Sequence, residues 1–266
     1  MAKQSGIHQL SGKVRGMSYY RQKGVSEGLA RTINTGMSER VKNDAGYLNT
    51  RLNAREFGSA GSFAGAAIRA ISDRQRTMLK DFATGALAKA VKALITQDTT
   101  NSWGERQLVG TDWQNEMLAR VSTYAKNDFN SFVGGVWDVA VTTGSGGQSW
   151  TPNAELAQGW GTLLSAKGAT GALIEMYAYL VELEDAGEYS GKGFSQVALV
   201  GSDDLAIGTA GTITEAATIG SQFDGVQGDN KMQGVLVVVK PYQEVNGQKY
   251  IRQELCTFAL YPVTSA

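Results

Sequence analysis

Between residues 63 and 95, apolar side chains recur at intervals of three and four residues. This spacing gathers them on one face of an α-helix, while most basic residues of the stretch fall off that face. The pattern predicts one long helix, weakest at Gly85, where a break is expected because glycine lowers helix stability. The apolar positions are Phe63, Ala67, Ile68, Ile71, Met78, Leu79, Phe82, Leu87, Val91, Leu94 and Ile95.

A second amphipathic segment follows a polar stretch, "TQDTTNSWGERQ". Thr111 and Gln114 have the spacing of a capping box, which predicts a helix beginning there. Its expected apolar face is formed by Met117, Leu118, Val121, Tyr124 and Phe129. The next segment, "FVGGVWDVAVTT", is rich in β-branched residues and is typical of a strand.

Beyond the loop "GSGGQSWTPNAELAQGWG" the pattern changes to that of strands. The segments are "ALIEMYAYLVELED", "GFSQVALVGS", "GTAGTITEAAT" and the long run from "MQGVLVVVK" to "FALYPV". Val235–Val239 is continuously apolar, which predicts a strand covered on both faces. Asn246-Gly247, between two strand patterns, predicts a two-residue β-hairpin turn.

Residues 1–60 lack a sustained apolar period. The segment "VRGMSYYRQKG" is compatible with a short hairpin, and a short helix is expected around residues 38–43. The segment has few apolar residues, so we expect an extended arm that becomes ordered on another surface. The predicted class is α+β, with an extended N-terminal arm, two or three helices and a C-terminal antiparallel β-sandwich. The expected domains are 1–60 (extended basic arm), 61–132 (helical region) and 133–266 (β-sandwich).

The formal net charge of zero conceals a division along the chain. Residues 1–100 carry 16 Lys and Arg against 7 Asp and Glu, whereas residues 101–266 carry 9 against 18. The stretch "GKVRGMSYYRQKG", residues 12–24, has four basic residues and no carboxylate. This asymmetry indicates an arm that contacts nucleic acid, a membrane or an acidic surface of another copy. No nucleic-acid motif is present, so we favour protein docking over nucleic acid.

Several classes of site are disfavoured. His8 is the single histidine, which argues against a Ser-His-Asp or Cys-His site and a His-based metal site. Cys256 is the single cysteine, excludes an internal disulfide and is expected to be buried on a strand. Gln196 stands in place of the third glycine of a dinucleotide-binding fingerprint. No apolar run approaches the length of a membrane span, and no secretory leader is expected. We expect no enzyme activity and no catalytic, metal-binding or cofactor-binding residues.

Acidic residues and tryptophans leave two other kinds of function open. A glycosidase carboxylate pair or a calcium loop would need acidic clusters, but the spacing favours solvated turns. The clusters are Glu182, Glu184, Asp185 and Glu188, and Asp203 and Asp204. Exposed aromatic rings would suit a carbohydrate-binding or receptor-binding module, with Trp150 or Trp160 as the platform, whereas helix-to-sheet packing explains the tryptophans equally well. The tryptophans are Trp103, Trp113, Trp137, Trp150 and Trp160.

The two ends of the chain resemble an uncharacterised structural protein family of Bacteroidetes genomes and their crAss-like phages. The resemblance lies in "GKVRGMSYYRQKG" followed by "RTIN", and in "GVLVVVKPYQEVNGQKYIRQ" with its "QEVNG" hairpin. The middle segment "REFGSAGSFAGAAIRA" is also similar. Arg15 is compatible with the family pattern, in which leucine or valine often precedes the glycine.

The resemblance implies a structural protein of the phage virion, made in the host bacterial cytoplasm. We expect a tail or collar ring component that forms a homo-oligomer through its basic N-terminal arm. Its expected partners are other copies and other virion proteins, such as the portal or neighbouring rings, with no membrane and no cofactor. Head decoration, a receptor- or carbohydrate-binding module and nucleic-acid binding remain alternatives. The expected interface residues are Arg15, Tyr19, Tyr20, Arg21, Lys23, Arg31, Arg40, Arg51 and Arg55.

Overall fold

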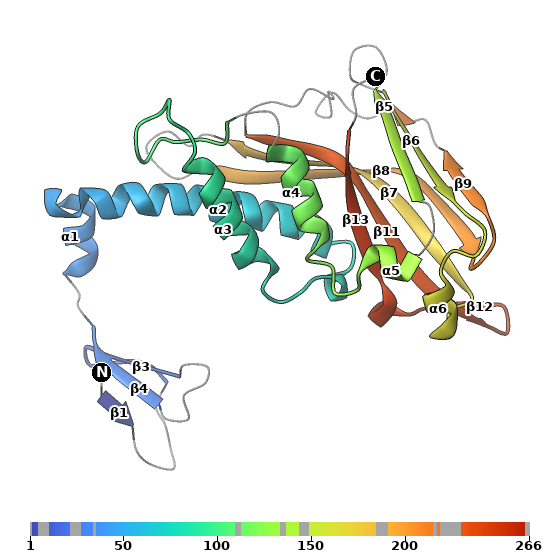
Figure 1. Ribbon diagram of the computed structural model, residues 1–266. Coiled ribbons are helices and arrows are strands. Elements are labelled where there is room, and N and C mark those ends of the chain that lie inside the picture. Colours follow the sequence, from blue (N-terminus) through green and yellow to red (C-terminus); the bar gives the residue numbers. More distant parts are fainter. Residues whose placement is uncertain are drawn as a thin grey trace. The chain divides into compact units, whose positions relative to one another are not determined.

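The computed structural model divides the chain into two compact units, Met1–Leu52 and Asn53–Ala266 (Figure 1). The residues that it describes are 2–4, 11–21, 28–33, 36–109, 113–133, 137–143, 149–184, 191–214, 217–218 and 230–263. Helices and antiparallel strands are both well represented, which confirms the α+β class.

The first unit contains a four-stranded antiparallel sheet with the order β1-β4-β3-β2. Its strands are β1 (Ala2–Gln4), β2 (Gly12–Val14), β3 (Met17–Tyr20) and β4 (Gly28–Thr32). The helix α1 (Met37–Asn43) and a 3₁₀ turn (Ala45–Tyr47) follow. The hairpin and the short helix expected in this region are both present. The expectation of an extended arm was wrong for these residues, because they pair into a sheet.

The helix α2 (Leu48–Ser72) begins earlier than the apolar pattern indicated, so residues 48–60 are helical rather than part of an extended arm. The expected single helix 63–95 is two helices, and the interruption lies at residues 73–82 rather than at Gly85. Tertiary pairing explains this position, because the backbone N–H of Lys80 donates to the carbonyl of Tyr124. The N–H of Lys126 likewise donates to the carbonyl of Met78. A short 3₁₀ helix (Arg76–Met78) lies in the interruption, and α3 (Ala83–Ile95) follows it.

The helix α4 (Trp113–Ser122) buries the apolar face expected of it, including Met117, Leu118 and Val121. Thr111 of the predicted capping box lies outside the described residues. The helix α5 (Phe129–Val133) takes up the start of the segment that resembled a strand, and β5 (Trp137–Thr143) forms its end. The helix α6 (Thr162–Ala166) follows β6 (Ser149–Leu156).

Two further antiparallel sheets belong to the second unit. One is a four-stranded sheet of β5, β6, β9 (Gly211–Thr214) and β10 (Ala217–Thr218). The other has five strands in the order β12-β11-β7-β8, with β13 also paired to β11. Its strands are β7 (Gly171–Glu184), β8 (Lys192–Ala206), β11 (Lys231–Val245), β12 (Gln248–Ile251) and β13 (Thr257–Pro262). A 3₁₀ turn (Gln253–Leu255) joins β12 to β13.

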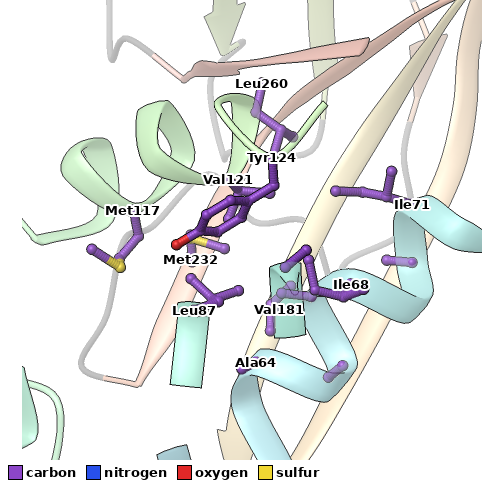
Figure 2. Packing of buried hydrophobic residues seen from close by; sticks show 14 of the residues in the cluster. Ala64, Ile68, Ile71, Leu87, Met117, Val121, Tyr124, Val181, Met232 and Leu260 are labelled. Carbon is purple, nitrogen blue, oxygen red and sulfur yellow. The ribbon is translucent and has the colours of Figure 1, made fainter. Parts of the chain in front are cut away.

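Apolar clusters cover both faces of the five-stranded sheet. On one face Tyr179 and Val181 of β7 pack with α2, α3 and α4, and Figure 2 shows this cluster from close by. On the other face Ile174 and Met176 pack with α5, α6 and the end of β6. Val235–Val239 is fully buried in β11, which confirms that this strand is covered on both sides. Cys256 is buried, as expected, and burial raises the pKa of its thiol to about 11.

The small residues of α2 allow this helix to lie directly against the start of β8. The backbone N–H of Gly193 donates to Ser62 Oγ at 2.6 Å, and that of Gly191 donates to Ser59 Oγ at 2.9 Å. A Cβ at position 193 would lie 2.2 Å from the carbonyl oxygen of Ser62. Glycine is therefore required here by close backbone approach, and serine hydroxyls satisfy donors that β7 does not reach.

Candidate assembly interface

The N-terminal unit presents a basic hairpin formed by β2 and β3. Val14 pairs with Met17, so Arg15 and Gly16 form a two-residue turn. Both turn residues have positive φ angles, 45° for Arg15 and 79° for Gly16. Turns of this kind favour asparagine or glycine at the first position, because a larger side chain is strained there by roughly 1 kcal/mol. Arg15 is exposed, so a charged side chain is held at the tip of the hairpin in an unfavourable conformation.

The two tyrosines that follow the turn lie on opposite faces of the small sheet. Tyr20 shares a face with Arg31, whose guanidinium carbon lies 5.6 Å from the centroid of the Tyr20 ring. Tyr19 lies on the other face, and its hydroxyl donates to Met17 Sδ at 3.7 Å. Residues Met17–Tyr20 are all partly exposed. The hairpin therefore presents aromatic surface beside basic side chains, the composition typical of protein interfaces.

Charge distinguishes this unit from the rest of the chain. Residues 1–52 contain nine Lys and Arg against three Asp and Glu, so the remaining residues carry an equal excess of acid. Lys13, Arg15 and Arg21 are exposed and have no ion-pair partner in the part of the chain that the structure describes. Cations without local partners are available to a carboxylate or phosphate from another molecule.

Three other residues of the expected interface have partners in their own unit. Arg40 lies 3.9 Å from Asp44, and its guanidinium lies over the ring of Tyr47. Arg51 donates to the carbonyl oxygens of Val41 at 2.8 Å and Asp44 at 2.9 Å, where it closes the end of α1. Arg55 belongs to the second unit, where it lies 3.9 Å from Glu105. Lys23 lies outside the described residues.

The acidic clusters do not come together as one carboxylate site. Asp204 accepts a hydrogen bond from the Tyr242 hydroxyl at 2.6 Å and pairs with Lys249. Burial raises the pKa of Asp204, but hydrogen bonds from Lys249 and Tyr242 outweigh this effect and hold the pKa below its ordinary value. Glu182 and Glu184 lie at the far end of β7, and Asp185 and Glu188 lie outside the described residues.

The tryptophans contribute mainly to packing where their side chains are described. Trp160 is almost fully buried, and its Nε1 donates to the carbonyl of Thr209 at 2.8 Å. It therefore cannot serve as an exposed platform for a sugar. Trp113 is buried against Phe63, with ring centroids 5.8 Å apart, whereas Trp103 is exposed. The side chains of Trp137 and Trp150 lie outside the described set.

Two carboxylates of the second unit, Glu56 and Asp98, are buried, and neither was predicted from the sequence. Glu56 of α2 accepts hydrogen bonds from Arg106 Nε and from the Gly104 N–H, both at 2.8 Å, and pairs with Lys92. Burial raises the pKa of Glu56, but these partners lower it by a larger amount. The pKa therefore lies below its ordinary value, and the carboxylate remains charged. In the sequence, Glu56 is recognisable as an acidic residue among the small residues of the segment that forms α2.

Asp98 is the second of these carboxylates. It accepts hydrogen bonds from the backbone N–H groups of Thr100, Asn101 and Gln107 and from the side chain of Asn101. Burial raises its pKa, but the four donors lower it to about 2. Through these hydrogen bonds Glu56 and Asp98 fix residues 100–107, between α3 and α4.

A groove of about 460 Å³ lies between α3 and α4. Alanine side chains, Met117 and Tyr124 form its apolar part, whereas Lys89, Glu116 and Arg120 lie at its polar positions. Among the described residues there is no group of three His, Cys, Asp or Glu side chains placed to hold a metal ion. None of the described helices combines the length and apolar character needed to cross a bilayer.

Comparison with known proteins does not assign the chain to a family. No family model and no curated protein matches it. Among solved structures, it is similar to the sporulation control protein Spo0M of Bacillus subtilis, with 12% identity and a TM-score of 0.26. That match covers 48% of each chain. OgpA of Akkermansia muciniphila matches at 12% identity and a TM-score of 0.15, over 60% of this chain and 40% of OgpA. The matches span less than half of either solved chain.

Proposed function

We propose that this protein is a non-enzymatic structural component of a phage virion, a tail or collar ring that assembles from identical copies. The basic N-terminal unit makes the contact between copies or with a neighbouring virion protein such as the portal. Arg15, Tyr19, Tyr20, Arg21, Lys23 and Arg31 form the core of that contact. The protein acts in the virion after synthesis in the host cytoplasm.

The conformation of Arg15 is the observation that carries the proposal. An exposed arginine at a φ of 45° costs free energy that asparagine would largely avoid. Strain of this kind is retained where a side chain has a role that outweighs its cost. A charged group held at the tip of a hairpin, with no acidic partner among the described residues, has the geometry of a contact residue.

The distribution of charge supports self-association. The basic excess of residues 1–52 equals the acidic excess of residues 53–266, so each copy carries both complementary surfaces. Head-to-tail contacts between unlike surfaces close into rings when the rotation between copies allows it. Contacts between opposite charges weaken as salt screens them.

We further propose that the two sheets of the second unit stack as the layers of a sandwich. Leu156, at the end of β6, belongs to the same apolar cluster as Ile174 of β7 and Val237 of β11. The helices α5 and α6 contribute the remainder of that cluster.

The proposal is tested by measuring the mass of the full-length protein by sedimentation velocity at low and high salt. We expect a discrete oligomer at low salt that dissociates as salt increases. The variant Arg15→Asn keeps the turn and removes the charge, and we expect a dissociation constant at least about tenfold higher, as for loss of a charged contact. Arg15→Lys should retain most of the association.

Lys42→Asn is the matched control, because Lys42 is an exposed basic residue of the same unit with Glu39 as its own partner. It should leave the oligomer unchanged. A monomeric wild-type protein at high concentration, or equal oligomers for wild type and Arg15→Asn, would refute the assembly role. Binding to single-stranded DNA that Arg15→Asn weakens, without any oligomer, would favour nucleic-acid binding instead.

A further inference from the structure

Strand β8 forms one edge of the five-stranded sheet along 15 residues. It pairs with β7 on one side, and among the described strands it has no hydrogen-bonded neighbour on the other. Long edge strands present unpaired N–H and C=O groups, and proteins usually protect them with charge, bulges or a covering element. The start of β8 is protected by α2 through Ser59 and Ser62, as described above. Within the described residues, no side chain of α2 hydrogen-bonds to the segment from Ser195 to Ser202.

Apolar side chains are exposed along this edge. Leu199 is 57% exposed, and Phe194 is 45% exposed. Val197 and Leu199 lie opposite Tyr179 and Tyr177 of β7, so both lie on the sheet face that the long helices cover further along. Partly buried Val197 and exposed Leu199 flank Ala198, so the centre of the segment is self-complementary for antiparallel pairing with another copy.

The charges at the two ends of β8 are also complementary. Lys192 lies opposite Glu184 and Asp203 lies opposite Ile174, both even-numbered residues of β7, so Lys192 and Asp203 lie on the same sheet face. Their separation of 11 residues would place them on opposite faces of a regular strand. The bulge near Val200, where the register shifts, brings them to the same face. Neither residue has an ion-pair partner within the described ranges.

We propose that β8 is an isologous interface at which a second copy of this chain adds its own β8, antiparallel and centred near Ala198. In this arrangement Leu199 of each copy lies opposite Val197 of the other. With the bulge residue Val200 left out of the register, Lys192 of each copy lies diagonal to Asp203 of the other on the same sheet face, within reach of its long side chain. A twofold contact of this type repeats each interaction twice. It joins two sheets into one continuous sheet and does not depend on the proposed role of the basic N-terminal unit.

The test uses full-length protein and sedimentation velocity over a range of concentrations, in the wild-type and Arg15→Asn backgrounds. We expect a dimer to persist in Arg15→Asn, which separates this contact from the N-terminal one. Leu199→Lys and Ser195→Pro should each raise the dimer dissociation constant at least about tenfold, through charge repulsion and loss of an outward N–H. Tyr250→Lys is the control, since Tyr250 is an exposed residue of β12, elsewhere in the same sheet.

Exchanging the charges of Lys192 and Asp203 tests the proposed strand pairing more specifically. Lys192→Glu alone and Asp203→Lys alone should each weaken the dimer, because each brings like charges together as diagonal neighbours on one sheet face. The double variant Lys192→Glu with Asp203→Lys should restore the wild-type dissociation constant. A dimer that is insensitive to Leu199→Lys and Ser195→Pro, no dimer in either background, or a double variant weaker than both single variants would overturn the proposal. Circular dichroism of each variant establishes that the fold is kept.

Discussion

The two units of this chain obtain their structure in different ways. Met1–Leu52 contains a four-stranded sheet, yet Leu29 and Ala30 are its only buried hydrophobic residues within the described ranges. Asn53–Ala266 encloses two apolar clusters, one on each face of its five-stranded sheet. Small sheets without a substantial core are marginally stable in isolation. The second unit therefore has a large core of its own, whereas the first has little.

The two units also differ in the turn residues of their hairpins. Arg15-Gly16 and Asn246-Gly247 are both two-residue turns with positive φ at both positions. Asn246 is well suited to this conformation, whereas Arg15 is not. The stable unit has the favourable turn residue, and the basic unit retains a charged residue despite the strain.

The largest effect is expected from the core of the second unit. Phe63 of α2 is fully buried and contacts Trp113 edge-to-face. Phe63→Ala should lower the free energy of unfolding by about 3–5 kcal/mol, because it removes buried apolar area and leaves a cavity. Chemical denaturation followed by tryptophan fluorescence measures this change.

Phe57→Ala is the matched control on the same helix, since Phe57 is 58% exposed. It should change stability by less than about 0.5 kcal/mol. Amide hydrogen exchange then sharpens the comparison, because Phe63→Ala should accelerate exchange in β7 and β11 and leave β3 and β4 unchanged. Equal acceleration in all four strands would show that the two units unfold together.

An intermediate effect is expected from Asp98. Its folded pKa of about 2 lies below the ordinary value of 3.8, so its ionised form stabilises the second unit. This contribution, about 2 kcal/mol, is fully present above pH 4 and is lost as the pH falls toward 2. Asp98→Asn should therefore destabilise the protein by about that amount at pH 7. The difference between variant and wild type should shrink steadily between pH 4 and pH 2 in denaturation experiments, and a constant difference would contradict this account.

The smallest effect is expected from exchanging the turn residues. Arg15→Asn should stabilise the first hairpin by roughly 0.5–1 kcal/mol, and Asn246→Arg should destabilise the second by a similar amount. Local hydrogen exchange in β3 and in β12 reports each change. If Arg15→Asn destabilises the first unit, Arg15 has a structural role there and the strain argument for a contact residue fails.

Much of the second unit could be predicted from local patterns. The continuous apolar run Val235–Val239 and the Asn246-Gly247 turn indicated a buried strand and its hairpin, and the structure confirms both. The interruption between α2 and α3 could not be predicted, because it depends on backbone pairing of residues 78–80 with residues 124–126. The low helix propensity of Gly85 has less effect on the position of this interruption than the backbone pairing has. The partners of the buried Glu56 come from α3 and the following segment, and no local spacing in the sequence indicates them.

The sequence by itself determined the α+β class, the excess of basic residues near the N-terminus and the turn at Asn246-Gly247. These properties depend on composition, on short periodicities and on the dihedral preferences of neighbouring residues. Only the tertiary structure decided where α2 ends, which carboxylates are buried and that Arg15 adopts a left-handed conformation. It also decided that a bulge places Lys192 and Asp203 on one face of β8. Each of these depends on contacts between segments distant in the chain, or on a strand register, which local sequence patterns do not specify.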